Sequence, residues 1–201
     1  MDRPTGDEAL ALTFDDGPDP VWTTIVLREL ARLDARATFF VIAPRAVAAP
    51  RQIEAMLRGG HEVGLHCWAH DRHSRSARHR VEDETDRALE ALAALGAAPR
   101  LWRTPWGDTA PWSEAVAASR GLTLTGWTAD THDWRGDTAE EMLAAVRLQL
   151  APGASVLMHD GIGPGARRTD CLHTVRLIPL LHRHATERGW RLGPLDAPVA
   201  A

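Results

Sequence analysis

Tyrosine, lysine and asparagine are absent from this sequence of 201 residues, and all 23 of its basic residues are arginine. Lysine is normally among the commonest residues of a globular protein. The codons of the three missing residues are rich in A and T, whereas those of alanine, arginine and glycine are rich in G and C. The absences therefore indicate a bacterial genome of high GC content, and we draw no functional meaning from them.

Cysteines and long apolar runs are also scarce. The two cysteines, Cys67 and Cys171, are too few for a disulfide framework and are compatible with a reducing compartment. No stretch approaches the roughly 18 consecutive apolar residues of a transmembrane helix, so no membrane association is expected. Residues 1–8 lack the apolar segment and cleavage site of a signal peptide, which predicts a cytoplasmic protein.

An excess of positive charge is missing as well. The formal net charge is −4, so the chain lacks the basic surface that binds a phosphate backbone, and no nucleic-acid partner is expected. The length, with 44% hydrophobic and 25% charged residues, predicts one globular domain over 8–196 with loose termini at 1–7 and 197–201. A domain of this size needs no disulfide or partner to fold, and we expect a monomer.

Short apolar runs alternate with helical patterns along the whole chain. Seven runs predict strands at 10–15, 37–42, 61–66, 101–104, 122–128, 155–159 and 190–192. Amphipathic segments predict helices at 22–33, 46–58, 81–95, 113–119, 138–150 and 169–188. This alternation predicts an α/β fold built on a parallel sheet, although periodicity alone leaves open whether the sheet closes.

The polar residues whose side chains could act in catalysis or bind a metal lie at one end of the predicted strands. Five clusters follow five strands in turn: Asp15-Asp16, His66 with His70, Arg103 to Trp106, Asp130 to Trp134, and His159 to Gly161. Parallel α/β folds place their active sites at the carboxyl ends of the strands, where the following loops converge. The placement therefore predicts an active site at this face.

His66 and His70 have the spacing of a metal site, because residues four apart share one face of a helical turn. Asp15 or Asp16 is the nearest candidate for a third ligand. Two histidines and one carboxylate leave a position open for water, as in catalytic zinc sites, but the same set holds Fe(II) in non-haem oxygenases. Two of ten histidines can also fall four apart on a surface helix without binding a metal.

Asp15 and Asp16 would repel each other at one site unless cations offset their charges. A metal could neutralise one of them and Arg103 could keep the other ionised, although the pair before Gly17 also suits a simple turn. His159 ends an apolar run and by itself would be a buried core residue. On this face, however, it is a candidate proton donor. A neighbouring carboxylate, from Asp130 or Asp133, would raise the pKa of His159.

Together these residues resemble a known family. The motifs are Thr13-Phe14-Asp15-Asp16-Gly17-Pro18, His66-x-x-x-His70, Arg103-x-Pro105-Trp106, Asp130-x-x-Asp133-Trp134-Arg135 and Leu157-x-His159. In this order, and over nearly the whole chain, they resemble the polysaccharide deacetylase family, the NodB-homology domain of carbohydrate esterases. The resemblance implies a single-domain distorted (β/α)₇ barrel. It also implies a metal-dependent hydrolase that removes an acetyl group, most often from an N-acetylated amino sugar.

The resemblance implies roles for the first motifs. Asp16, His66 and His70 would bind a divalent metal, usually zinc, with Co²⁺, Ni²⁺ or Mn²⁺ as alternatives. Asp15 would be the general base for the attacking water, and Arg103 would orient it and keep it ionised. Cys67 stands where the family usually has Ser or Thr. Its weaker hydrogen bonding predicts a lower metal affinity, or the thiol favours a softer ion.

The later motifs complete the implied site. His159, tuned by Asp133, would protonate the departing amine. Trp106 would hold the oxyanion through its backbone N–H, although the family usually has Tyr or Phe there. Trp134 and Leu157 would shape the acetyl pocket.

Several alternatives stay open at this point. The substrate could be a chitooligosaccharide, peptidoglycan or a small acetylated intermediate. The same machinery could act on an O-acetyl ester, as on acetylated xylan, and a non-haem iron oxygenase or a non-catalytic sugar-binding protein are readings of another class. The glycine-rich stretch 161–168 is interpreted as a mobile active-site loop. Arg167 and Arg168 in it are interpreted as a solvated charge pair, with contact to an anionic substrate as the alternative.

Overall fold

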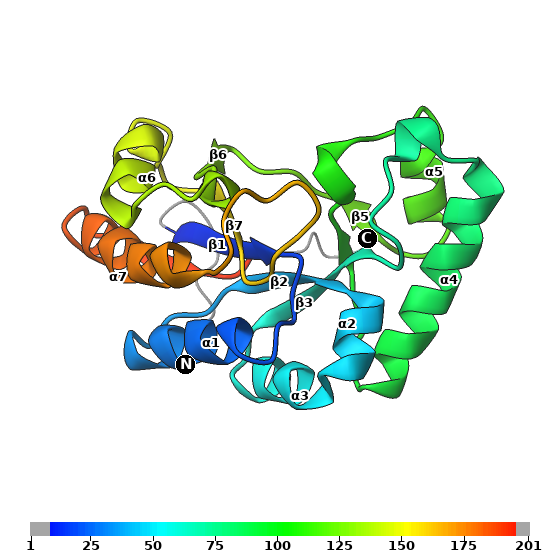
Figure 1. Ribbon diagram of the computed structural model, residues 1–201, viewed down its shortest axis with the longest axis horizontal. Helices are drawn as coiled ribbons and strands as arrows, with labels where there is room; N and C mark the ends of the chain where they lie inside the picture. Colours follow the sequence, from blue (N-terminus) through cyan, green and yellow to red (C-terminus); the bar gives the residue numbers. More distant parts are fainter. Residues whose placement is uncertain (1–8, 196–201) are drawn as a thin grey trace.

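The computed structural model of the protein describes residues 9–195, so the predicted loose termini lie outside the described residues. The strands are β1 (Ala9–Asp15), β2 (Thr38–Ile42), β3 (Glu62–Cys67), β4 (Leu101–Trp102), β5 (Thr123–Leu124), β6 (Ala129–Asp130), β7 (Ser155–His159) and β8 (Arg191–Gly193). The α-helices are α1 (Trp22–Arg32), α2 (Ala43–Ala48), α3 (Pro50–Arg58), α4 (Arg78–Ala94), α5 (Ser113–Ala118), α6 (Ala139–Val146) and α7 (Leu172–Thr186). Strands and helices alternate as predicted along most of the chain (Figure 1), but the helix predicted at 46–58 is two helices, α2 and α3, and no helix separates β5 from β6.

The strands form one parallel sheet in the order β5-β4-β3-β2-β1-β7-β6, and β8 pairs with the first half of β1. This confirms the predicted α/β class. Strands β5 and β6 stand at opposite ends of that order although only residues 125–128 separate them. The sheet therefore curls into a half-barrel whose edges are bridged by a short segment.

That bridge corrects the prediction of one strand over 122–128. Within this range the structure has only β5, and β6 begins one residue after it. Residues 125–128 are not part of a strand, although Thr125 and Thr128 each donate one backbone hydrogen bond to a sheet residue. The carbonyl oxygen of Gly126 instead accepts a hydrogen bond from Arg103 Nη2 at 2.7 Å. A side chain inside the curl thus satisfies a backbone group that a continuous strand would have used for sheet pairing.

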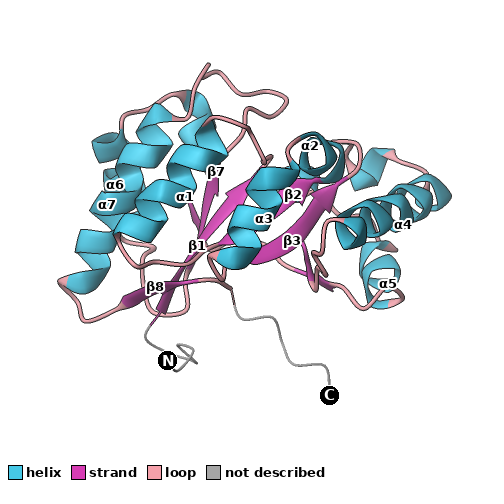
Figure 2. Cartoon of the chain, turned by 90° about the horizontal axis from the view of Figure 1, so that it is seen from below, coloured by secondary structure: helices cyan, strands magenta, loops and turns pink. Residues whose placement is uncertain are grey.

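The two faces of β1 show how the sequence shapes the curl. Leu10, Leu12 and Phe14 belong to the hydrophobic core, and Phe14 stacks on Phe39 of β2 with ring centroids 5.1 Å apart. Because side chains alternate along a strand, the residues between them face the inside of the curl. Figure 2 shows α1 and α3 lying over the sheet, on the side that these apolar residues cover.

The inside of the curl carries polar side chains that lead to the carboxyl ends of the strands. Thr13 is fully buried there, and its hydroxyl donates to the Val156 carbonyl at 2.7 Å. A long connection, residues 160–171, runs from β7 to α7 at this end and is called the β7–α7 loop below (Figure 1, gold). Among the described residues, no helix is long and apolar enough to cross a membrane.

Candidate active site

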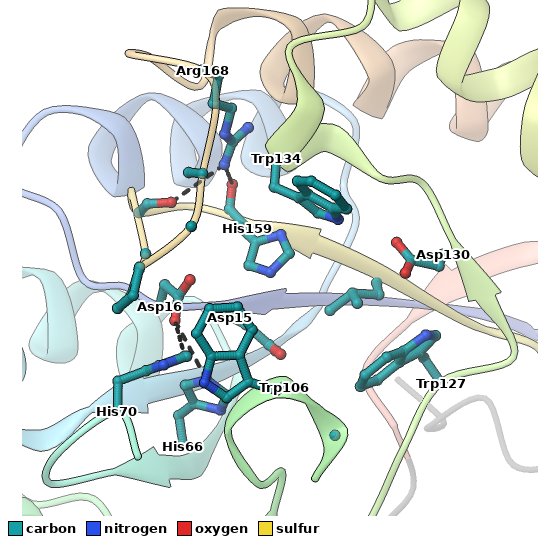
Figure 3. A pocket seen from close by; sticks show the side chains of 17 residues that line it. Asp15, Asp16, His66, His70, Trp106, Trp127, Asp130, Trp134, His159 and Arg168 are labelled. Carbon is teal, nitrogen blue, oxygen red and sulfur yellow. Dashed lines mark hydrogen bonds and ion pairs between the residues drawn. The ribbon is translucent and has the colours of Figure 1, made fainter. Parts of the chain in front are cut away.

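A pocket of about 330 Å³ opens at the carboxyl ends of the strands, where the sequence predicts the active site. Its lining includes eight of the predicted site residues: Asp15, Asp16, His66, His70, Trp106, Trp134, Leu157 and His159 (Figure 3). The other two, Arg103 and Asp133, are buried directly behind them.

Asp16, His66 and His70 come together as predicted for a metal site. Asp16 Oδ1 lies 3.4 Å from His66 Nε2 and 3.3 Å from His70 Nε2. The predicted helical turn is wrong, because His66 lies in β3 and His70 in the loop that follows it. The loop bends back over the strand end and brings the two rings to a centroid distance of 5.1 Å.

The chemistry of these donors suits a divalent cation. His66 Nδ1 lies 2.8 Å from the carbonyl oxygen of Arg103, which only accepts, so this nitrogen carries the proton and Nε2 presents a lone pair to Asp16. Asp16 Oδ1 is buried without a hydrogen-bond partner in the described structure. Burial opposes ionisation of Asp16, but when the His66 and His70 rings are protonated, their hydrogen bonds and charge outweigh this and hold the pKa of Asp16 well below its ordinary value. Positive charge at this place, from protons or from a cation, thus favours the Asp16 carboxylate. Lone pairs that face one another in a buried cluster fit a bound cation.

Asp15, the neighbour of this cluster, is held by a buried arginine. Arg103 Nη1 donates to Asp15 Oδ1 at 2.8 Å and to Thr13 Oγ1 at 2.7 Å. The guanidinium also packs over the Phe40 ring at 4.2 Å, and none of it is exposed. A buried charge pair of this kind fixes both partners, so the Asp15 carboxylate has one orientation toward the pocket.

A second charge pair lies across the pocket. Asp133 Oδ1 is 2.7 Å from His159 Nδ1, and Asp133 Oδ2 accepts the backbone N–H of His159 at 2.9 Å. Burial alone would lower the pKa of His159, but the charge and hydrogen bond of Asp133 outweigh it and raise the pKa to about 9. Of the two carboxylates considered from the sequence, Asp133 is the partner, because Asp130 pairs with His132 at 2.9 Å.

Aromatic side chains form the walls. Trp106 stands edge-on to His70 at a centroid distance of 5.0 Å and is 42% exposed. Trp134 lies beside His159, and Trp127, on the bridge between β5 and β6, covers a further side of the pocket (Figure 3). Stiff apolar walls with few polar groups suit a small acyl group and a sugar ring.

Comparison with known proteins gives the family. The model of the family described as polysaccharide deacetylase matches residues 2–125. A chitooligosaccharide deacetylase of Bradyrhizobium sp. (strain ANU 289) is 36% identical over 198 residues, which cover 95% of this chain and 90% of that protein. This chain belongs to the polysaccharide deacetylase family. The resemblance that its motifs suggest is thereby confirmed.

Solved structures of similar proteins have the same fold. A crystal structure of a peptidoglycan N-acetylglucosamine deacetylase matches with a TM-score of 0.87 at 26% identity, over 96% of this chain and 88% of that one. A family 4 carbohydrate esterase from Streptomyces lividans, solved with acetate, matches with a TM-score of 0.85 at 28% identity, over 94% of each chain. The expected (β/α)₇ architecture is confirmed, in the form of the curled half-barrel described above.

The sequence interpretation missed one member of the deacetylase site. Arg168 was expected to be half of a solvated charge pair, but its side chain is only 6% exposed and its Nη1 lies 3.0 Å from Asp133 Oδ2. Nothing in a glycine-rich segment distinguishes a buried arginine from an exposed one. Its partner lies 35 positions earlier in the chain, which only the folded topology brings close.

Asp160 is a second residue that the sequence left without a role. Its side chain is fully buried and its Oδ2 accepts a hydrogen bond from Thr23 at 2.5 Å. Burial raises the pKa of Asp160 to about 7, although the Thr23 hydrogen bond opposes this. Its backbone N–H donates to the Asp15 carbonyl at 3.2 Å, so Asp160 supports the strand end that carries the aspartate pair.

Cys67 lies outside the metal cluster. Side chains alternate along β3, so His66 points into the curl while Cys67 lines a small crevice with Val81 and Thr85 of α4. Burial raises the pKa of the Cys67 thiol well above its ordinary value. Any effect of this residue on a bound metal would therefore act through the position of the strand.

Proposed function

We propose that this protein is a hydrolase that removes the acetyl group from an N-acetylated amino sugar. One observation carries the proposal: the cluster suited to a cation lies in one pocket between a fixed carboxylate, Asp15, and an imidazole paired with a carboxylate, His159. Hydrolysis of an amide needs a base for the attacking water and an acid for the departing nitrogen. The pocket presents both groups to one space.

On the first side, Asp15 takes a proton from the water that attacks the acetyl carbon. Arg103 leaves this carboxylate one orientation and offsets its charge beside Asp16. The backbone N–H of Trp106 is our proposed donor to the oxygen of the acetyl group as its negative charge develops.

On the second side, His159 holds the proton that the reaction must return. With Nδ1 bonded to Asp133, its Nε2 is the atom left for the pocket. As the C–N bond breaks, the amine takes this proton and the acetyl carbon keeps the oxygen of the water, so the products are acetate and a free amino sugar. A pKa of about 9 keeps the imidazole protonated at neutral pH before the proton is given up.

We propose zinc as the cation held by Asp16, His66 and His70, because two imidazoles and one carboxylate leave an open position typical of catalytic zinc. Bound there, a divalent cation would lower the pKa of a water molecule and polarise the acetyl carbonyl. The iron oxygenase alternative gives no duty to Asp15 or to the Asp133–His159 pair.

For the substrate class we propose a chitooligosaccharide, a peptidoglycan fragment or a small glycoside that carries an N-acetylglucosamine-type unit. The named chemistry of the similar proteins supports the N-acetyl choice. Trp106, Trp134 and Leu157 are the proposed contacts for the acetyl group and the sugar ring. A pocket of about 330 Å³ admits such a unit.

The test is acetate release by chelator-stripped protein, with and without added zinc, from chitooligosaccharides, peptidoglycan fragments and acetylated xylan. We expect zinc-dependent acetate from an N-acetylated substrate. Acetate from acetylated xylan alone would make the protein an O-acetyl esterase, and oxygen uptake with bound iron would make it an oxygenase. Full activity in Asp15→Asn would show that the assigned base is wrong.

A further inference from the structure

Arg168, in the β7–α7 loop, makes more contacts around the active site than its sequence setting suggests. Besides its ion pair with Asp133 Oδ2, its guanidinium donates hydrogen bonds from Nη2 to the carbonyl oxygens of His159 at 2.9 Å and Gly161 at 3.3 Å, and from Nη1 to the Thr174 hydroxyl. With 6% of its side chain exposed, it is a buried cation with several fixed acceptors.

These contacts complete the hydrogen bonds and ion pair around the Asp133 carboxylate. Asp133 Oδ1 accepts from the His159 ring, and Asp133 Oδ2 accepts from Thr174 Oγ1 at 2.7 Å and from the His159 backbone. Arg168 Nη1 forms an ion pair with the same oxygen at 3.0 Å. A carboxylate bonded through both oxygens cannot rotate. Its orientation sets the orientation of the His159 ring, which lines the pocket.

The same loop also covers the pocket. A Cβ atom at Gly163 would overlap the Asp16 carboxylate, and one at Gly165 would press on the Trp106 ring. The start of the loop is fastened by Arg45, whose guanidinium donates to the carbonyls of Asp16 and Ile162 at 2.7 Å and 2.9 Å. Arg168 fastens the far end. The loop that covers the cation cluster is thus tied to the acid pair.

We propose that Arg168 is a positioning residue for the Asp133–His159 pair, and that it ties the β7–α7 loop, which covers the pocket, to this pair. This inference rests on the proposed function, because it concerns the proton that His159 gives to the departing amine. It predicts that a loss of Arg168 damages the protonation step and leaves the attack on the carbonyl intact.

Protonation of the leaving group and attack on the carbonyl can be measured separately, because two kinds of substrate depend on the proton to different extents. A departing sugar amine needs the proton, whereas the phenolate of 4-nitrophenyl acetate leaves without one. A variant with a misplaced acid therefore loses turnover on the N-acetyl sugar and keeps turnover on the aryl ester. A variant that has lost its fold or its cation loses both.

We would measure kcat and KM of Arg168→Gln and Arg168→Lys on an N-acetylated chitooligosaccharide and on 4-nitrophenyl acetate, using the zinc-loaded full chain. For Arg168→Gln we expect kcat on the sugar to fall about 10- to 100-fold, since small displacements of a reacting group carry such costs. KM should change little and the ester rate should stay near that of the parent. Lysine keeps the charge but loses the forked geometry, so we expect it to recover only part of the loss.

Two further variants keep the result interpretable. Arg176→Gln removes an exposed arginine of α7 and should leave both rates unchanged. Thr174→Val removes a single donor to Asp133, and it tests the proposal with a smaller effect in the same direction if Arg168→Gln does not fold. An equal loss on both substrates in folded, zinc-loaded variants, or no loss on either, would overturn the proposal. Inactivity of the parent protein on every acetylated sugar would instead contradict the proposed function.

Discussion

The two sides of the pocket differ in how completely their polar atoms are bonded. On the cation side, formed by Asp15, Asp16, His66 and His70, the buried Asp16 Oδ1 faces Nε2 of both histidines and has no hydrogen-bond partner within the described residues. On the acid side, formed by Asp133, His159, Arg168 and Thr174, both carboxylate oxygens of Asp133 are bonded, and the buried atom without a partner among the described residues is a donor, Arg168 Nε. Both sides are buried, so the difference is not one of exposure.

The difference indicates which side awaits a ligand. A buried carboxylate oxygen without a donor costs free energy, and the cation of our proposal would offset that cost at Asp16. On the acid side, hydrogen bonds to Asp133 already hold the proposed proton donor in place. Removal of the ion and removal of a side chain should therefore have different consequences on the two sides.

The largest expected effect comes from splitting the aspartate pair. Asp16→Asn should lose both zinc binding and activity, because an amide oxygen carries no charge to offset that of the cation. Asp15→Asn should keep its zinc and lose activity by about 10²- to 10⁴-fold, the usual range for a general base. Zinc content after gel filtration and acetate release measure the two properties separately.

An exposed aspartate provides the control for this comparison. Asp86→Asn, on α4 and paired with Arg120 at the surface, should retain both zinc and activity. Stoichiometric zinc in Asp16→Asn, or loss of zinc in Asp15→Asn, would show that the two neighbouring carboxylates are assigned the wrong way round.

The next effect concerns pH dependence on the acid side. His159 must be protonated to act, so activity should fall as pH rises through its pKa, about 9 in the cation-free protein. Asp15 and Asp16 contribute to that raised value, so a bound dication should bring the alkaline limb of kcat/KM below 9. Asp133→Asn removes the negative charge and replaces a charge-assisted hydrogen bond by a neutral one, and should move the alkaline limb down by at least one further pH unit.

The measurement is a profile of kcat/KM between pH 5 and 10 for the parent, Asp133→Asn and His159→Gln. In His159→Gln the rate on the N-acetyl sugar should fall about 100-fold and the alkaline limb should disappear. An alkaline limb that stays in place in both variants would assign the acid to another group.

The sequence predicted the site better than the path of the chain around it. Residues such as Asp15 and His159 stand at strand ends, and the two-residue period of a strand settles which side they face. Arg103 and Asp133 could also be named, because they belong to motifs. The split of the predicted strand 122–128 could not be foreseen, since it depends on a hydrogen bond from Arg103 to Gly126 inside the curl.

Arg168 shows the same limit. Its contacts join β7, α7 and the segment around Asp133, which approach one another only in the folded barrel. The expected monomer, the cytoplasmic location and the absence of a nucleic-acid partner stay predictions, because they concern other molecules or the cell. Local pattern is thus informative about side chains that act from strand ends, and uninformative about side chains that join distant loops.

Substitution of Asp160 is expected to change activity least, but to change the pH dependence of stability. Asp160 follows His159 of the acid side, and its backbone N–H donates to the carbonyl of Asp15 on the cation side. Its raised pKa means that the folded protein holds a proton that the unfolded chain releases near pH 4. The free energy of unfolding should therefore decline as pH rises from about 4 to about 7, by up to a few kcal/mol for a shift of this size. Asp160→Asn mimics the protonated carboxyl and should lack this decline.

Urea unfolding of the cation-free protein and of Asp160→Asn at pH 5 and pH 8 measures the difference. His159 also loses stabilisation with rising pH, but in a higher window, from its ordinary value near 6.5 to about 9, and it does so in both proteins. The contribution of Asp160 is therefore the difference between the two curves below pH 8. If the two proteins lose the same stability between pH 5 and pH 8, Asp160 is ionised in the fold. Asp15, Asp16 and Asp160 would then all be negatively charged at this end of the sheet, and the cation-free protein would not have enough positive charge there to offset them.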